Sequence, residues 1–566
     1  MEPTIKEGSS RRLVLAISCF ASLGVFLFGY DQGVMSGLIT NPFFRSYFHQ
    51  PSRVELATMV AILEIGALIT SLLAGRVGDI FGRRATIFVG ACIFSLGGLF
   101  QAFTTGFRMM VFGRILSGFG VGFLSMCVPV YQSEISPAEN RGRLGCIEFT
   151  GNIFGYASSV WIDYFASYIT SDLSWRFPLL MQSVIGIILA IGTLFLPESP
   201  RWLIDTEQDE EGMGVLADLH GDGDPEDERA QEEFREIKEG VLAEREFGDR
   251  TYKAMWRRYK YRVLIAMSAQ FCAQLNGINV ISYYAPLVFE QAGWIGRDAI
   301  LMTGINSIVY IASTVPTWYL VDTLGRRPIL LSGAATMAVA LTLVGFFLYL
   351  DAPYTPNAVV GCVIIYNAAF GFSWGPIPWL YPAEILPNAF RVKGVSLSTA
   401  ANWLSNYVVG EATPILQETI EWRLYPMHAG FCVFSFILVY FAYPETMGVP
   451  LEEMDELFGD QPRHPLLPTS DEEGEHAPLR RSHSIPTFRH GRPHSHADHV
   501  EPPYPRNHKR TLSGASLPGR GSDGVEAVRG WWSGSQGGSS RGGSRPTTPR
   551  IRDYQAVRQE TDDDRP

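Results

Sequence analysis

Apolar residues fill two long stretches of the chain, 13–197 and 262–444, in runs that are almost free of charge. A bilayer core ~30 Å thick is crossed by about 20 apolar residues of α-helix, so each run predicts a membrane-spanning helix. We identify twelve such runs: 13–33, 57–75, 85–105, 109–131, 145–167, 177–196, 262–289, 299–320, 328–350, 359–380, 392–410 and 427–443. The predicted fold class is therefore an all-α membrane protein with twelve transmembrane helices.

Polar segments divide the chain around these helices. The pattern predicts an N-terminal segment (1–12), a six-helix bundle (13–197), a central loop with short helices (198–261), a second six-helix bundle (262–444) and a tail (445–566). The tail from residue 460 is rich in Pro, Ser, Gly, Arg and His and lacks apolar periodicity, which is typical of disorder. We expect most of the tail to be disordered.

Basic residues in short loops indicate the orientation of the helices, because such loops lie mainly in the cytoplasm. They share one predicted side of the membrane: Lys6, Arg11, Arg12, Arg76, Arg83, Arg84, Arg141, Arg143, Arg326, Arg327, Arg391 and Lys393. With an even number of spans, both termini are predicted to be cytoplasmic.

Composition excludes several classes of protein. The net charge of −11 argues against nucleic-acid binding, which favours basic surfaces. The seven cysteines are odd in number and lack ligand-like spacing, so they predict neither a disulfide framework nor a metal site. The polar segments contain no nucleophile–base set or metal cluster. We therefore expect no enzyme activity, cofactor or metal.

The sequence also contains an internal duplication. Asp79 and Asp322 precede matching Gly-Arg-Arg sequences and lie 243 residues apart. Glu134 and Glu384 lie 250 residues apart, and each stands seven residues before an arginine. Pro-Glu pairs close spans six and twelve at a similar offset. Two like-oriented bundles related by an axis along the membrane normal are known in one transporter class, with the substrate site between them at mid-membrane.

These motifs resemble the major facilitator superfamily, and within it the sugar porter family. The resemblance covers about 13–458 and is carried by Gly75–Arg84, Tyr131-x-x-Glu134-x-x-Pro137…Arg141-Gly142, Pro197-Glu-Ser-Pro-Arg201-Trp202, Gln274-Leu-Asn-Gly-Ile-Asn279 and Pro444-Glu445-Thr446. Trp175–Gln182 and Trp161–Tyr164 look like fungal monosaccharide and polyol transporters. The resemblance implies the major facilitator fold and alternating-access transport of a neutral sugar or polyol with a proton. It also implies a multi-pass, monomeric protein of the plasma membrane.

The family pattern implies a proton-coupling pair. An acid after Phe-Gly-Tyr in span one faces an arginine in span four, which here are Asp31 and Arg114. A carboxylate beside Arg⁺ stays ionised, and loss of the pair lets it take a proton. The alternative is a permanent structural ion pair. Glu64, Glu148 and Asp163 are further ionisable residues within spans, and each is either a helix contact, a hydrated group or a proton carrier.

The resemblance also implies a sugar site. Amide side chains donate and accept hydrogen bonds at once, and aromatic faces stack on a sugar ring. The residues expected to bind the substrate are Phe28, Gln274, Asn279, Tyr283, Tyr284, Trp379 and Asn402. Two family positions lack their usual glutamine and carry Ala273 and Phe149, so a pentose, a less oxygenated sugar or a polyol fits better than glucose. The alternative is that these amides only bridge helices, at ~0.6 kcal/mol each.

Charged residues at the predicted cytoplasmic helix ends form a candidate gate. The expected members are Asp79, Arg83, Glu134, Arg141, Glu198, Arg201, Asp322, Arg326, Glu384 and Arg391. We expect them to lock the two bundles together when the site faces outward. Topology signalling alone would use the arginines but not the matched acids.

Two other functions remain open from the sequence. One is facilitated diffusion of sugar without protons, and the other is a sugar sensor that signals through its long tail. The sequence does not identify the sugar or distinguish the plasma membrane from an internal one.

Overall fold

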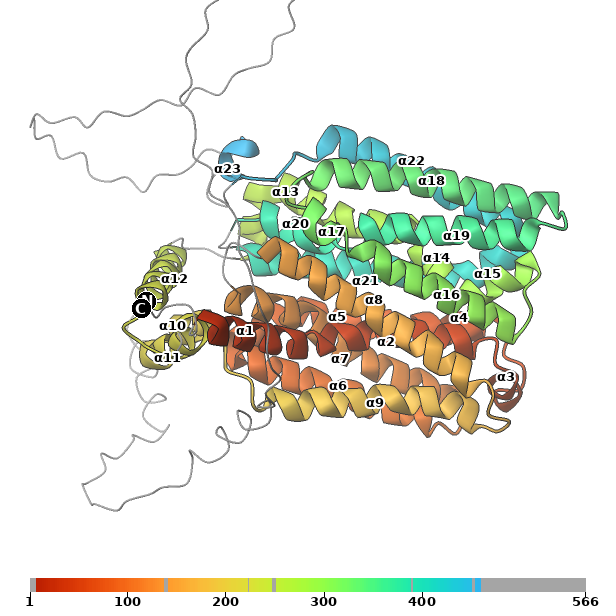
Figure 1. Ribbon diagram of the computed structural model, residues 1–566, viewed down its shortest axis with the longest axis horizontal. Coiled ribbons are helices and arrows are strands. Elements are labelled where there is room, and N and C mark those ends of the chain that lie inside the picture. The colour runs from red at the N-terminus through yellow and green to blue at the C-terminus, as the bar shows by residue number, and fades with distance from the viewer. Residues whose placement is uncertain are drawn as a thin grey trace, which may run out of the picture. The chain divides into compact units, whose positions relative to one another are not determined.

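The computed structural model describes residues 7–136, 141–221, 223–246, 251–387, 390–449 and 454–459, and every regular element among them is helical. Two parts lie outside the described residues. They are 1–6, the first half of the predicted N-terminal segment, and 460–566, the part of the tail predicted to be disordered. The long helices run side by side along one axis (Figure 1).

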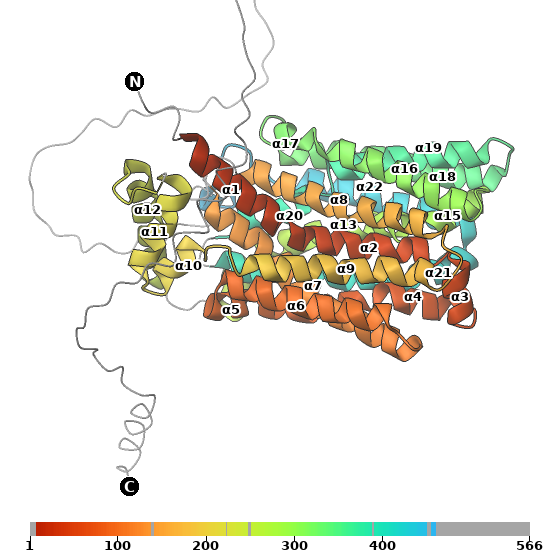
Figure 2. The ribbon, with the colours of Figure 1, turned by 60° about the horizontal axis from the view of Figure 1, so that its bottom comes forward.

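The first half of the chain forms one bundle, seen from a second direction in Figure 2. Its helices are α1 (Glu7–Ala21), α2 (Leu23–Leu38), α3 (Pro42–Tyr47), α4 (Arg53–Ala61), α5 (Leu63–Phe81), α6 (Arg83–Ala102), α7 (Phe107–Ile135), α8 (Arg141–Ala166) and α9 (Leu173–Thr193). Short helices follow: α10 (Pro200–Asp205), α11 (Asp209–His220) and α12 (Glu228–Glu246). These helices lie within 198–261, the segment predicted to be the central loop.

The second half forms the other bundle. Its helices are α13 (Tyr252–Leu275), α14 (Ile278–Ser282), α15 (Ala285–Ala292), α16 (Arg297–Thr314), α17 (Thr317–Leu320), α18 (Arg326–Leu350), α19 (Thr355–Phe372), α20 (Ile377–Ile385), α21 (Arg391–Thr419), η3 (Glu421–Arg423), α22 (Leu424–Ala442) and α23 (Met454–Leu457). Figure 1 shows α10–α12 beyond one end of the bundles and α3 at the other. We call these the arginine end, where Arg83 and Arg326 begin α6 and α18, and the α3 end.

Ten stretches of the described chain are long and apolar enough to cross a membrane. The remaining two predicted spans correspond to α8 and α21, which carry buried polar residues such as Asn152 and Asn402. Both helices pack between the halves, α8 against α16 and α21 against α4 and α5. Their polarity thus follows from their place at the centre of the molecule, and the twelve-helix fold is confirmed.

The duplication is visible in the backbone at the arginine end. Gly82 and Gly325 have nearly the same dihedral angles, φ +91° and ψ 164° against φ +90° and ψ 164°. This region is essentially restricted to glycine. The Glu198 carboxylate accepts a hydrogen bond from the backbone amide of Arg83 at 2.8 Å. In the second half, the Glu445 carboxylate accepts a hydrogen bond from the backbone amide of Arg326 at 2.9 Å. A carboxylate therefore caps the N-terminus of the same helix in each half.

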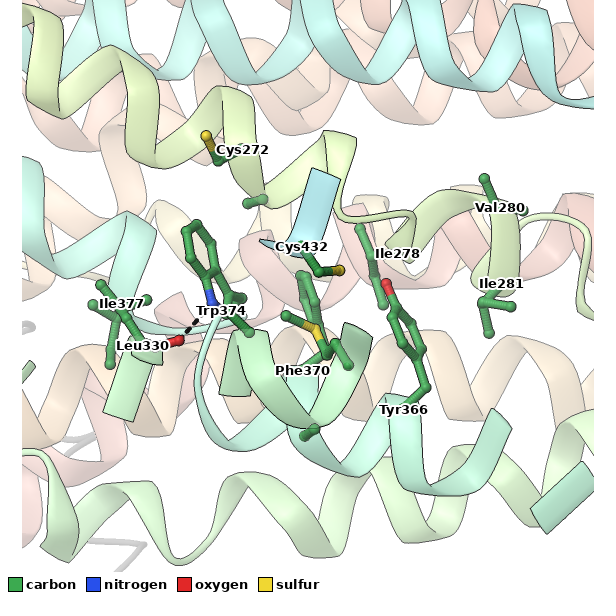
Figure 3. Packing of buried hydrophobic residues seen from close by; sticks show 14 of the residues in the cluster. Cys272, Ile278, Val280, Ile281, Leu330, Tyr366, Phe370, Trp374, Ile377 and Cys432 are labelled. Carbon is green, nitrogen blue, oxygen red and sulfur yellow. Dashed lines mark hydrogen bonds between the residues drawn. The ribbon is translucent and has the colours of Figure 1, made fainter. Parts of the chain in front are cut away.

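Two helices of the second bundle are broken at mid-length. Gly277 adopts φ +95° between α13 and α14, which frees carbonyl groups. Tyr366 donates to the Asn276 carbonyl at 2.9 Å and His428 donates to that of Leu275 at 2.7 Å. Between α19 and α20, Trp374 donates to the Leu330 carbonyl at 2.9 Å (Figure 3). Broken helices are tolerated within a membrane where protein groups satisfy the backbone, as they do here.

The two halves touch toward both ends. At the arginine end, a Cβ placed on Gly75 of α5 would lie 2.7 Å from Val392 of α21, so the two helices are in direct contact. Toward the α3 end, Thr58 of α4 donates to Glu411 of α21 at 2.9 Å. The two halves are therefore in contact at both ends.

Candidate functional site

A cavity of about 40 Å³ lies between the two halves. Its lining comes from α2 and α8 of one bundle and from α13, α14, α16, α19–α21 and the α19–α20 break of the other. The lining residues are Phe28, Gln32, Phe149, Asn152, Ile153, Tyr156, Gln270, Ala273, Gln274, Ile278, Asn279, Ser282, Tyr310, Phe370, Trp374, Gly375, Trp379 and Asn402. The volume holds about three water molecules at roughly 10–15 Å³ each, so a larger guest has to move side chains.

Amide side chains form a hydrogen-bonded chain along one wall. Gln274 donates to Asn402 at 2.7 Å and accepts from Asn279 at 2.6 Å. Asn279 also donates to Asn406 of α21. Each amide carries donors and acceptors, so a ligand hydroxyl that breaks one of these contacts is offered both kinds of partner.

Aromatic rings form another part of the wall. Phe28 lies edge-on to Trp379, with ring centroids 6.5 Å apart, and to Trp403, with centroids 4.9 Å apart. Trp379 and Trp374 both line the cavity, and the helix break at Gly375 places them on either side of the bend. These rings offer apolar faces beside the amides.

Most of the predicted binding residues share this cavity. Phe28, Gln274, Asn279, Trp379 and Asn402 line it together. Tyr283 and Tyr284 do not appear in its lining, although both are buried. They follow α14 toward the α3 end, where Tyr284 donates to the Gly410 carbonyl at 2.8 Å. Their predicted direct contact with the substrate is not supported in this conformation.

The two sequence departures also lie in the cavity wall. Ala273 and Phe149 both line it, and a Cβ placed on Gly375 would lie 2.4 Å from the Phe149 ring. Sequence reasoning missed Gln32 and Gln270, which also line the cavity. Polar residues in otherwise apolar spans were the available signal for both.

Asp31 and Arg114 form an ion pair inside the first bundle. Arg114 Nη1 lies 2.7 Å from Asp31 Oδ1 and 2.8 Å from Oδ2, and each side chain is 2% exposed. Arg114 Nη2 donates to the Val60 carbonyl at 2.8 Å, near the junction of α4 and α5. The structure thus brings the predicted pair together and ties it to a third helix.

A second buried acid lies just after the junction of α4 and α5. Glu64, near the start of α5, is 1% exposed and accepts a hydrogen bond from Tyr283 at 2.7 Å. Glu148 and Asp163 of α8 are also buried, at 8% and 4% exposed.

The gate residues form two separate clusters at the arginine end. Arg83 donates to Glu134 at 2.9 and 3.0 Å and to Asp79 at 3.1 Å. Arg326 repeats the arrangement with Glu384, at 2.7 Å, and with Asp322, at 3.1 Å.

Each of these ion pairs lies within one bundle, so the expectation that they link the bundles is not met in this conformation. Arg201 lies in α10 and Arg391 begins α21, while the side chain of Arg141 lies outside the described residues. Gly75 of α5 lies against Val392 and Ser396 of α21 at this end, which is one contact between the halves.

Comparison with known proteins gives matches over most of the chain. The family model described as "Sugar (and other) transporter" matches residues 17–458. The MFS-type transporter criB of Aspergillus cristatus is 35% identical over 79% of this chain and 94% of its own. The high-affinity glucose transporter of Kluyveromyces lactis is 30% identical over 81% of this chain and 89% of its own.

A solved structure is similar as well. The proton:xylose symporter XylE of E. coli, bound to 6-bromo-6-deoxy-D-glucose, is 29% identical with a TM-score of 0.69. The match covers 78% of this chain and 98% of XylE.

Proposed function

Because the chain belongs to the sugar transporter family of the major facilitator superfamily, we propose that it carries a neutral monosaccharide or polyol across the plasma membrane together with a proton. The arginine end faces the cytoplasm in this proposal, since basic loops lie on that side. A single chain forms the whole pathway.

The observation that carries the proposal is the composition of the cavity wall. Its lining consists of amides, hydroxyls, aromatic rings and aliphatic groups, with no charged side chain among the described residues. An ionic substrate buried there would lack a counter-charge, which is costly in a low-dielectric interior. A polyhydroxylated neutral molecule is matched by the Gln274–Asn279–Asn402 amides and by the Trp379 ring.

The contacts between the halves at both ends support alternating access. Rocking of one bundle against the other separates α5 from α21 at Gly75 to open the cytoplasmic side. The opposite rotation breaks the Thr58–Glu411 bond and opens the other side. The Arg83 and Arg326 clusters hold the helix ends of each bundle together, so that each moves as one body.

The proton role rests on Asp31 and Arg114. As long as Asp31 is ionised, it holds Arg114 in place against the Val60 carbonyl. Protonation removes the attraction and loosens the contact among α2, α4 and α7, which changes the relative stability of the two open states. The similar protein XylE is named a proton:xylose symporter, which favours coupling over facilitated diffusion.

Substrate choice follows from Ala273 and Phe149. Each stands where the family usually has a glutamine, and neither side chain can form a hydrogen bond. The cavity wall therefore offers fewer hydrogen-bond partners to the hydroxyls of a hexose. We therefore propose a pentose or a polyol as the preferred substrate.

The test is uptake of labelled hexoses, pentoses, disaccharides and polyols in a yeast strain without its own sugar carriers, with external pH recorded. Phe149→Gln should shift preference toward glucose, whereas Phe154→Gln, at an exposed position of the same helix, should not. A chain that signals but transports none of these compounds would overturn the proposal.

A further inference from the structure

We propose that Glu64 is a second proton-binding residue, and that the sugar site controls its protonation through Asn279, Asn406 and Tyr283. The proposal rests on the transport function above and assigns a role to a buried acid that the Asp31–Arg114 pair does not explain.

Tyr283 joins Glu64 to the other half of the molecule. Glu64 belongs to the first bundle, and Tyr283, which donates to its Oε1, belongs to the second. The second oxygen, Oε2, is buried and has no hydrogen-bond partner among the described residues. An ionised carboxylate with one free oxygen in a buried place is poorly stabilised, so it has room for a proton at Oε2.

The Tyr283 hydroxyl is fully used in this arrangement. It accepts from Asn406 at 3.1 Å and from Gln32 at 3.4 Å, and it donates to Glu64. A hydroxyl has one donor and two acceptor sites. With both acceptor sites occupied by amides, its hydrogen is directed at Glu64, and the chain of dipoles favours the ionised carboxylate.

The same chain reaches the cavity. Asn406 accepts from Asn279, which lines the cavity and also donates to Gln274. A ligand hydroxyl that takes the Asn279 amide withdraws it from Asn406. The Asn406 amide is then free to turn, Tyr283 loses its fixed direction, and the ionised form of Glu64 loses its support. Sugar binding therefore favours protonation of Glu64, and by linkage protonation favours sugar binding.

The charges around Glu64 point the same way. Groups that act on it electrostatically, or on its tyrosine neighbours, are Asp31 of α2, Arg114 of α7, Tyr283 and Tyr284 after α14, and Tyr407 and Glu411 of α21. Arg114 is the one cation in this set, and its Nη1 is committed to Asp31. Among the described residues, Glu64 thus has no ion pair with a cation.

The experiment uses the full-length protein in proteoliposomes, with labelled substrate affinity measured as a function of pH. Each coupled proton makes the affinity fall by up to about tenfold per pH unit on the alkaline side. Glu64→Gln should reduce the slope of log affinity against pH by up to one while sugar exchange continues. Tyr283→Phe, which removes only the relay hydroxyl, should flatten the slope in the same direction.

Glu418→Gln is the matched control, because Glu418 also pairs across the halves, with Arg53 at 3.8 Å, but is exposed and has no bond to the cavity amides among the described residues. It should keep the wild-type slope. A wild-type slope in both Glu64→Gln and Tyr283→Phe would overturn the proposal, and if Glu64→Gln does not fold, the result for Tyr283→Phe decides. Substrate transport with no pH dependence in the wild type would also overturn it while leaving sugar transport intact, whereas absence of any transport would overturn the proposed function itself.

Discussion

Replacement of Asp31 by Asn tests the proton-coupling pair directly. The asparagine keeps the shape of the side chain, but its amide nitrogen cannot accept from Arg114. One of the two contacts from Nη1, at 2.7 and 2.8 Å, is therefore lost together with the negative charge. Removing one partner of a buried ion pair costs about 3–5 kcal/mol, because the remaining charge is left unpaired.

The functional consequence is a loss of proton-driven accumulation. The proton carried by Asp31 contributes about tenfold accumulation per pH unit of gradient, since one unit is worth about 1.4 kcal/mol. At an imposed gradient of two units, this proton should therefore contribute about 100-fold to the accumulation ratio in wild-type proteoliposomes. Asp31→Asn lacks the group that takes this proton, so its accumulation ratio should fall by about that factor.

The assay pairs this measurement with counterflow. Counterflow requires binding and reorientation but no proton gradient, so Asp31→Asn should retain it. Concentrative uptake at the wild-type ratio in this variant would refute the assignment of Asp31. Loss of counterflow as well would show that the pair serves structure alone.

Three further changes test other parts of the structure. Trp379→Ala removes an aromatic wall of the cavity, worth up to about 1.5 kcal/mol, and should raise the half-saturation concentration for uptake about tenfold. Gly325→Ala places a Cβ 2.5 Å from the Glu445 carboxylate at φ +90°, which should destabilise the protein by about 1–3 kcal/mol and lower its melting temperature, whereas Gly361→Ala, with no neighbour within 4 Å, should not. Burial lowers the pKa of His220, but the Glu233 carboxylate and the Ile135 carbonyl raise it more, so the net pKa lies above its usual value. The stabilising contact is complete below the unfolded pKa of about 6.5 and is lost as pH rises through the folded pKa. Protease cleavage within α11–α12 should therefore increase with pH in the wild type, and His220→Gln should remove that dependence.

The sequence predicts the helices well because membrane spans leave a strong signal. Apolar runs predicted all twelve spans. These include α8 and α21, whose polar residues lower their mean hydropathy. The duplicated Gly-Arg motifs, which indicated an internal repeat, lie at the starts of α6 and α18.

The candidate site is less predictable, for a geometric reason. Gln274 and Asn279 line the cavity, whereas Tyr283 does not appear in its lining and donates to Glu64. The left-handed residue Gly277 lies between α13 and α14 and interrupts the helical period. A periodicity counted from Gln274 therefore does not carry through to Tyr283.

The ion pairs at the arginine end show a different limit. The spacing from Glu134 and Glu384 to the arginines that follow them suggested pairs between the bundles. The structure pairs Glu134 with Arg83 and Glu384 with Arg326 inside each bundle, whereas the pairs of Arg141 and Arg391 stay predictions. Sequence spacing gives the composition of such a cluster, but it does not say which helix end a long side chain reaches.

The self-contained capping of each bundle has a consequence for assembly. Glu198 accepts a hydrogen bond from the first amide of α6 and Glu445 from that of α18, so each half caps this helix with its own carboxylate. The helices α10–α12 pack with one another and with α1 and α7 of the first half. A chain cut between α12 and α13 would thus yield two polypeptides, each with its own carboxylate cap. We expect that the two can be produced separately and recombined in one membrane.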